Sequence, residues 1–415
     1  MICPPNRRSA ELIARRDLKM ARSAHAYVRG STTQFYEWLA SPKTTVIPSG
    51  PPVWICGDCH IGNLGPIGHS EGNAVVEMRD LDQTVIGNPA HDLVRLALSL
   101  AMAARSSDLP GVTTARLTED LVAGYEIAFE GENVSEEIEE LPQPIQFVMK
   151  RAVKRTSRRL LDERIGGKRR KFKLGPKFWP LDADEQQAVG RIIGQEPIRQ
   201  LITRLEDRDA ELPVRLLDAA FWVKGCSSLG LWRVAALVEF HVEGKKRETE
   251  LALLDIKQAI APSAPWAAGT DPDLAPGLRV LAGAKRLAPA LGSRMLAGKL
   301  LDRSVFVREL LPQDLKVELD HIGVDDARRV AYYLGKVVGR AHRRQLDVTA
   351  TRAWLAELRS HRTKNIEAPN WLWTALIQLV ALHEHAYLEH CRQYALASSR
   401  AEDRAQPLDE PVRTE

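Results

Sequence analysis

The densest group of chemically active side chains lies in Cys56-Gly57-Asp58-Cys59-His60-Ile61-Gly62-Asn63. Three kinds of chemistry use residues of these types. The Cys-x-x-Cys-His spacing is that of c-type haem attachment. Two cysteines at this spacing can also bind zinc or exchange a disulfide. Asp58 and Asn63, five residues apart, are a pair that phosphoryl transfer can use.

The two cysteine-based alternatives need features that we do not find elsewhere in the sequence. Haem attachment takes place after export, and the first 17 residues have no apolar core typical of an export signal. A structural zinc site needs four ligands, whereas Cys3, Cys226 and Cys391 are isolated. Both alternatives therefore have less support than phosphoryl transfer.

Acidic residues after the next apolar run favour phosphoryl transfer. Apolar runs at 53–56 and 74–78 predict two strands, which end shortly before Asp58 and Asp80-Leu81-Asp82. Phosphoryl transfer needs a carboxylate that orients and deprotonates the attacking hydroxyl. It also needs a carboxamide and a second carboxylate to hold Mg²⁺. Asp58, Asn63 and Asp80 supply these groups in that order.

Residues 57–63, 80–82 and 86–93 resemble motifs of the aminoglycoside phosphotransferase and choline kinase group, in the protein-kinase-like superfamily. That group has a Gly-Asp-x-His-x-x-Asn loop, a strand ending in Asp, and Gly-Asp-Pro-x-x-Asp-Leu. The resemblance implies that Asp58 is the catalytic base and that Asn63 and Asp80 hold metal, with Asp82 as an additional ligand. Asn88 departs from the pattern, which has Asp there.

A nucleotide-binding lobe is expected further along the chain. Runs at 221–224, 229–238 and 250–256 predict three strands. The first turn contains Gly225, Ser227, Ser228 and Gly230, and glycines let backbone N–H groups approach phosphates. Lys257 ends the third strand, where a lysine can neutralise phosphates.

The elements after Lys257 continue the resemblance. A helix at 276–291 and a strand at 304–311 follow, and Glu309 lies where the resemblance places the hinge of the lobe. A helix at 325–344 resembles the one that precedes the catalytic loop in the superfamily. The catalytic and metal loops would then come first in the chain and the nucleotide lobe second, as a circular permutation.

Most of the chain also resembles a bacterial family catalogued as domain of unknown function 2252. The matching pieces include 20–30, 57–63, 80–82, 92–99, 225–230, 257–259 and 307–309. The family brings no established activity. It usually has Gly where this loop has Ser227.

These patterns predict an α+β, protein-kinase-like bilobal fold, with a mostly helical catalytic lobe and a small antiparallel-sheet nucleotide lobe. We expect the catalytic and metal loops in 1–145, a basic helical insertion in 146–214 and the nucleotide lobe in 215–312. The rest of the helical lobe is expected in 313–398, followed by a disordered tail in 399–415.

Composition limits the class of protein. The 415 residues are 44% hydrophobic and carry a net charge of +4, which excludes disorder of the whole chain. We find no apolar run of the length that spans a membrane, and we expect a cytoplasmic protein. Residues 150–177 are strongly basic, but the low net charge and a single aromatic, Phe172, argue against nucleic acid as partner.

The function expected from the sequence is transfer of phosphate from ATP, with Mg²⁺, to a hydroxyl of an unidentified small-molecule or protein acceptor. Arg29, His60 and Arg308 are possible substrate or phosphate contacts. No acidic residue near 279–286 is placed to pair with Lys257. This absence favours an alternative, a nucleotide-binding pseudokinase with a regulatory role. Nucleotidyl transfer on the same fold is a third possibility, and the oligomeric state is not predicted.

Overall fold

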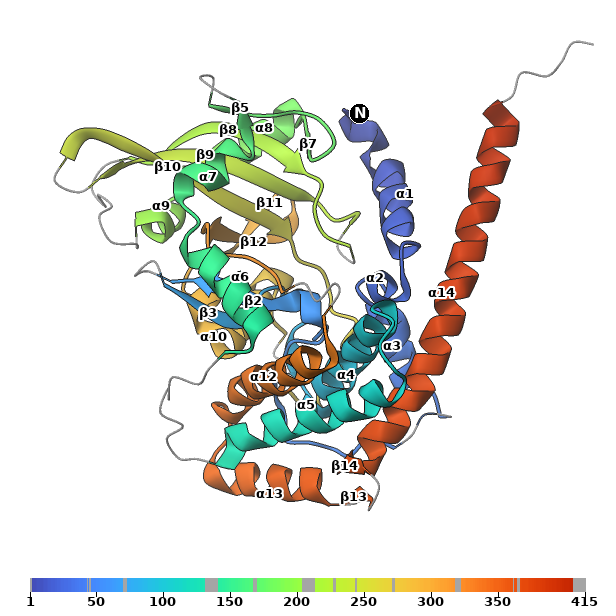
Figure 1. Ribbon diagram of the computed structural model, residues 1–415. Coiled ribbons are helices and arrows are strands. Elements are labelled where there is room, and N and C mark those ends of the chain that lie inside the picture. Colours follow the sequence, from blue (N-terminus) through green and yellow to red (C-terminus); the bar gives the residue numbers. More distant parts are fainter. Residues whose placement is uncertain are drawn as a thin grey trace, which may run out of the picture.

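The computed structural model describes residues 2–42, 44, 46–69, 73–130, 141–166, 170–203, 213–226, 229–242, 245–270, 273–317, 322–360, 362–363 and 366–405. In these residues a six-stranded antiparallel sheet lies beside a larger group of helices (Figure 1). The α+β class and the antiparallel sheet predicted from the sequence are confirmed.

The main sheet has the strand order β11-β12-β10-β9-β8-β7. Its strands are β7 (Phe178–Trp179), β8 (Arg215–Trp222), β9 (Arg233–Val242), β10 (Lys245–Gln258), β11 (Met295–Leu300) and β12 (Arg303–Leu310). Lys257 lies near the end of β10, opposite Phe306 of β12. The strand predicted at 221–224 starts earlier than expected and ends at Trp222.

The two faces of the sheet bury different groups because side chains alternate along each strand. Leu254 and Ile256 of β10 pack on one face with α8 (Ala183–Ile193) and α9 (Glu196–Thr203). Asp255 and Lys257 therefore point to the opposite face, toward the helical part. Leu253 also lies on that face, in an apolar cluster with Phe172 and other residues of the basic insertion.

Helix α4 (Pro89–Ser106) is at the centre of the helical part and is buried along most of its length. Asn88 caps it, with its side-chain oxygen accepting from the backbone N–H of Ala90, while its amide nitrogen donates to Pro48 O. The surrounding helices are α1 (Arg8–Met20), α2 (Ala24–Val28), α3 (Thr32–Leu39), α5 (Val112–Glu130), α12 (Val324–Arg343), α13 (Val348–Arg359) and α14 (Asn370–Ala405). Single-turn η1 (Pro5–Arg7) precedes α1, and η2 (Ile61–Asn63) lies in the Asp58 loop.

Helices α5 and α12 approach each other closely at glycine. A Cβ atom on Gly335 would lie 2.2 Å from the backbone oxygen of Leu121, and a Cβ on Gly124 would lie 1.8 Å from that of Tyr332. Neither position can hold a side chain without moving a helix backbone. The glycines thus fix the position of α12, whose last turn supports the Asp58 loop.

Short strand pairs position the loops near a cleft between the sheet and the helices. The cleft is lined by Asp80, Lys257 and Arg308, among others. Two pairs flank the motifs near residues 58 and 80, and two lie elsewhere. They are β1 (Val53–Ile55) with β4 (Val85–Gly87), β2 (Leu64–Gly68) with β3 (Ala74–Met78), β5 (Ile165–Gly166) with β6 (Lys171–Phe172), and β13 (Arg362–Thr363) with β14 (Ile366–Pro369). Helices α10 (Pro276–Leu287) and α11 (Pro289–Gly292) connect β10 to β11.

The insertion at 146–214 is not only helical. Besides α6 (Gln143–Val153), α7 (Ser157–Asp162), α8 and α9, it contains β5, β6 and β7, and β7 joins the main sheet. Helix α14 also continues through 399–405, where we expected a disordered tail. Residues 406–415 lie outside the described part of the chain. Among the described residues, no helix is both long and apolar enough to cross a membrane.

Candidate functional site

The backbone of the Asp58 loop is held by Asp92, near the start of α4. The fully buried Asp92 carboxylate accepts hydrogen bonds from the backbone N–H groups of Cys56 (2.7 Å) and Gly57 (3.0 Å). His342, at the end of α12, donates to the same carboxylate from Nε2 at 3.2 Å. Asp92 therefore joins α4 and α12 to the loop that carries Asp58.

Replacing Asp92 with alanine should destabilise the protein by about 3 kcal/mol, because two buried N–H groups lose their acceptor. The free energy of unfolding from urea titration measures this loss. The exposed Asp184→Ala change is a matched control and should cost less than about 1 kcal/mol. Equal effects of the two changes would show that Asp92 does not support the loop.

Asp58 is itself buried, and its charge is matched by Arg95 of α4. Arg95 Nε donates to Asp58 Oδ1 at 3.1 Å, and a second guanidinium nitrogen lies 3.0 Å from the same oxygen. Burial raises the pKa of Asp58, while Arg95 opposes this rise and the nearby Asp80 adds to it. Asp58 is thus a carboxylate with a raised pKa, a property suited to accepting a proton.

His60 and Asn63 lie beside Asp58. His60 Nε2 is 3.8 Å from Asp58 Oδ2, and burial lowers the pKa of His60 well below its usual value. Asn63 Nδ2 donates to the backbone oxygen of Asp58 at 3.0 Å. This bond uses the amide nitrogen and leaves the amide oxygen as the atom that could bind a cation.

Lys257 connects the sheet to the loop Asp80-Leu81-Asp82, which we call the acidic loop. Its Nζ lies 3.2 Å from Asp80 Oδ1 and also donates to Asp82 Oδ2. The Lys257 side chain is only 2% exposed, whereas that of Asp80 is 39% exposed. The structure therefore joins residues predicted from two separate segments of the sequence.

The two carboxylates on Lys257 have opposite pKa shifts. Burial alone would raise the pKa of Asp80, but the cations Lys257, Arg308 and Arg233 hold it below its usual value. Burial, and then repulsion from Asp80, raise the pKa of Asp82 to about 6. In addition, Asp82 Oδ1 is buried and has no hydrogen-bond partner within the described part of the chain.

Asp82 should make stability depend on pH. Its raised pKa means that ionised Asp82 opposes folding above about pH 6, and that this penalty declines as the pH falls toward the ordinary carboxyl pKa of about 4. Asp82→Asn removes the penalty. The free energy of unfolding of the variant minus that of wild type should therefore decrease by about 1 kcal/mol as the pH is lowered from 7.5 to 5.

Urea denaturation of both proteins at pH 5, 6 and 7.5 measures this change. Asp162→Asn, at an exposed aspartate of α7, is the control and should show no such dependence on pH. A stability difference between Asp82→Asn and wild type that is constant over this range would contradict the assignment.

Helix α10 supplies an arginine to the acidic loop, and no acid of this helix pairs with Lys257 in the described structure. Arg279 donates to the backbone oxygens of Asp82 (2.7 Å), Ile260 (2.9 Å) and Thr84. The counter-ions of Lys257 thus come from the loop, in Asp80 and Asp82, and α10 fixes the backbone of that loop.

Further cations surround this group. Asp255 is fully buried between Arg233 (2.7 Å) and Arg308 (3.0 Å). Lys224 lies 4.1 Å from the centre of the Trp222 ring, and burial together with repulsion from Arg233 lowers its pKa well below normal.

In all, five cationic side chains share three carboxylates on this side of the sheet. The cations are Lys224, Arg233, Lys257, Arg308 and Arg79, and the carboxylates are Asp80, Asp82 and Asp255. Nearby Asp314 is matched by Arg294 at 2.9 Å. Even without Lys224, whose pKa is lowered, the cations of the cleft outnumber its carboxylates.

The glycine turn is only partly described. Gly225 and Gly230 have φ angles of 105° and 113°, which favour glycine, and Lys19 Nζ donates to Gly225 O at 2.9 Å. Ser227 and Ser228, predicted to contact nucleotide, lie outside the described residues.

Glu309 is not brought to the cleft. It lies opposite Leu254 in the sheet, so its side chain points to the face away from Lys257. Its backbone N–H donates to Arg294 O, and its backbone oxygen accepts from Arg294. The backbone groups that a hinge would offer to a nucleotide are therefore already used.

Comparison with known families gives one match. Residues 8–393 match the model of a family described as "Uncharacterized protein conserved in bacteria (DUF2252)". The chain belongs to the DUF2252 family. Neither the search of curated proteins nor the search of solved structures found a match.

In this DUF2252 protein the cysteine-based alternatives gain no support. Cys56 and Cys59 are buried in the main core with at most 1% exposure. No three His, Cys, Asp or Glu side chains form a possible metal site in the described residues. A metal in the cleft would therefore need the Asn63 amide and ligands from a substrate as well as carboxylates.

The cleft of the DUF2252 protein is nearly closed. The cavity lined by Asp80, Lys257, Phe306, Arg308 and their neighbours has a volume of about 10 Å³, which is room for about one water molecule. A ligand of nucleotide size can occupy it only after the sheet and the acidic loop separate.

Sequence reasoning did not assign Arg95, Asp255 or Arg279 to the site. Arg95 gave a usable signal, because a charged residue within the apolar run 93–104 must find a partner when the helix is buried. Asp255 gave a similar signal in strand 250–256. Arg279 gave no comparable signal in the sequence.

Proposed function

We propose that this protein transfers the terminal phosphoryl group of ATP, with Mg²⁺, to a hydroxyl group of an acceptor. The observation that carries the proposal is the meeting of Lys257 with Asp80 and Asp82 in a cationic cleft, beside the Asp58–Asn63 loop. Lysine, carboxylates, carboxamide and base are the groups that phosphoryl transfer uses.

The residues present fit a magnesium nucleotide. Asp80, the Asn63 amide oxygen and the unpartnered Asp82 Oδ1 are oxygen ligands of the kind that Mg²⁺ takes, together with phosphate oxygens. The excess of cations calls for an anionic ligand. When bound, Mg²⁺ would neutralise charge on the phosphates.

Each protein group has a definite task in the proposed reaction. Asp58 orients the acceptor hydroxyl and takes its proton, while the hydroxyl oxygen forms a bond to the terminal phosphorus and the bond to ADP breaks. Lys257 and Arg308 stabilise negative charge on the phosphates. Arg95 keeps Asp58 in place.

The order of elements supports a kinase-like lobe placed after the catalytic loop. A glycine turn joins β8 to β9, Lys257 lies on the third strand β10, and α10 precedes β11 and β12. This is the order expected from the resemblance, and we infer that the chain is a permuted member of that superfamily.

A nucleotide-binding regulator without transferase activity is the second candidate. It is favoured by the pairing of Lys257 with Asp82 in place of a helical acid, and by the small volume of the closed cleft. Such a protein would bind ATP and form no product.

Calorimetry of ATP binding with and without Mg²⁺ tests the shared part of both candidates. ATP turnover with a panel of hydroxyl acceptors then separates them, because only a transferase forms product. The mass gained by the acceptor distinguishes transfer of a phosphoryl group from transfer of AMP. Absence of ATP binding in both conditions would contradict both candidates.

A further inference from the structure

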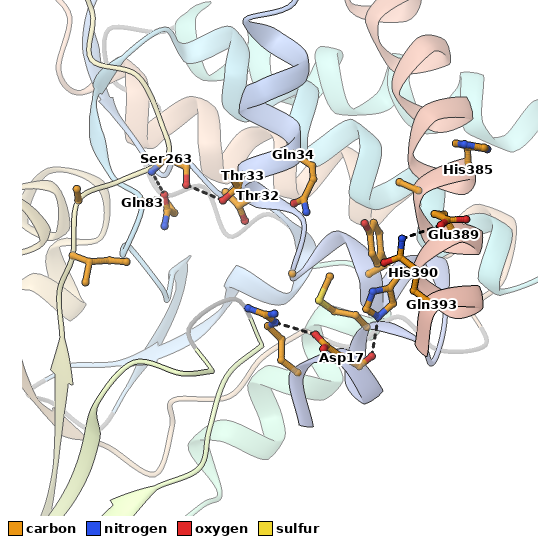
Figure 2. A pocket seen from close by; sticks show the side chains of 17 residues that line it. Asp17, Thr32, Thr33, Gln34, Gln83, Ser263, His385, Glu389, His390 and Gln393 are labelled. Carbon is orange, nitrogen blue, oxygen red and sulfur yellow. Dashed lines mark hydrogen bonds and ion pairs between the residues drawn. The ribbon is translucent and has the colours of Figure 1, made fainter. Parts of the chain in front are cut away.

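A second cavity is lined by residues of α1, α3 and α14, by Gln83 and by the segment 260–263. Its volume is about 530 Å³, within the range of small-molecule sites. Figure 2 shows its two sides, with Thr32, Gln34, Gln83 and Ser263 on one and Asp17 with the α14 residues Glu389 and Gln393 on the other.

This cavity adjoins the proposed base. Thr32 lines it, and the Thr32 hydroxyl accepts a hydrogen bond at 3.4 Å from Arg95, which also donates to Asp58. Gln83 follows Asp82 in the acidic loop and also lines the cavity. A molecule bound here would therefore lie beside Thr32, which Arg95 links to Asp58, and beside the residue that follows Asp82.

The two acids that line the cavity have cationic partners within the protein. The Asp17 carboxylate lies 3.2 Å from Arg16, and the Glu389 carboxylate lies 2.6 Å from Arg392. Neither acid needs a cation from a ligand, and the described residues of the basic stretch, 150–166 and 170–177, are not part of the lining. This arrangement favours neither a cationic nor an anionic molecule.

Amides and hydroxyls make up much of the remaining polar lining, beside the imidazoles of His385 and His390. Gln83 accepts a bond from the backbone of Ser263, whose hydroxyl is 3.1 Å from that of Thr33, and Gln34 and Gln393 extend from opposite sides (Figure 2). Such groups both donate and accept hydrogen bonds, as the hydroxyl groups of a polyol do.

We propose that this cavity binds the acceptor of the reaction and that the acceptor is a neutral polyhydroxylated compound, such as a sugar or a cyclitol. The assignment of the cavity as an acceptor site rests on the proposed function. In the reaction, a ligand hydroxyl beside Thr32 would lose its proton to Asp58 and gain the phosphoryl group, and ADP would leave.

Binding of four probes to the wild-type protein, measured by saturation-transfer NMR without ATP, tests the proposal. Glucose and myo-inositol are neutral, glucosamine is cationic and glucose 6-phosphate is anionic. We expect at least one neutral probe to bind, and to bind more tightly than both charged ones. The double variant Gln34→Leu/Gln393→Leu should weaken that binding at least tenfold, and exposed Gln187→Leu is the matched control.

Failure of this inference can be told apart from failure of the proposed function. No binding of a neutral probe, tighter binding of a charged probe, or unchanged binding by the double variant would overturn the polyol site. ATP binding by the wild-type protein is measured in the same series. If ATP binds and the neutral probes do not, the acceptor assignment is wrong while the nucleotide site stands.

Discussion

Replacing Asp58 with asparagine should lower the rate of phosphoryl transfer by at least about 100-fold, because general-base catalysis contributes roughly 10²–10⁴-fold. Asparagine can still accept the hydrogen bond from Arg95 and so keeps the shape of the loop. It cannot take a proton. ATP binding should therefore remain within about threefold of wild type, since this substitution removes a transition-state contribution.

The measurement is turnover of ATP with the acceptor found by screening, together with calorimetry of ATP binding on the same preparations. Asp162→Asn, at an exposed aspartate, should leave both quantities unchanged. Because burial raises the pKa of Asp58, wild-type activity should decrease in acid at a pH above the usual carboxyl range. Full activity in Asp58→Asn would rule out Asp58 as the base.

Replacing Asp80 with alanine should make ATP binding at least tenfold weaker in the presence of Mg²⁺ and remove most of its dependence on the metal. Mg²⁺ in nucleotide sites is held by one or two carboxylates and by phosphate oxygens. Asp80 is the more exposed of the two carboxylates on Lys257. It is therefore better placed than Asp82 to meet a metal that arrives with a nucleotide.

Calorimetry at fixed Mg²⁺ and in EDTA measures this effect. Loss of one partner from a buried ion pair can also destabilise a fold, so Asp80→Asn, which keeps the shape of the side chain, is measured alongside, with Asp184→Ala as control. Metal-dependent binding of wild-type strength in both Asp80 variants would show that Asp80 is not a metal ligand.

The sequence predicted the local parts of the site because these parts depend on a few neighbouring residues. The strand at 74–78 was predicted with its observed bounds, and the helix from 325 was predicted within a residue of its start. The periodic spacing of apolar residues indicates such elements directly. The Asp58 loop and the Asp80–Asp82 loop could be named for the same reason.

The missed parts depend on contacts between distant segments. Whether Glu309 or Arg308 faces the cleft depends on the register of β12 against β10, and a shift of one residue would exchange them. The pairing of Lys257 with Asp82 depends on residues 175 positions apart. The strands of the basic insertion were missed because β5, β6 and β7 are only two residues long.

The three cationic side chains that join the sheet and α10 to the acidic loop also have a kinetic consequence. Lys257 bonds to Asp80 and Asp82, Arg308 to the backbone of Arg79, and Arg279 to the backbone of Asp82. Any molecule larger than water can enter this cleft only after some of these bonds break. The association rate of such a ligand is then set by the frequency of opening and levels off at high ligand concentration, well below the diffusion limit.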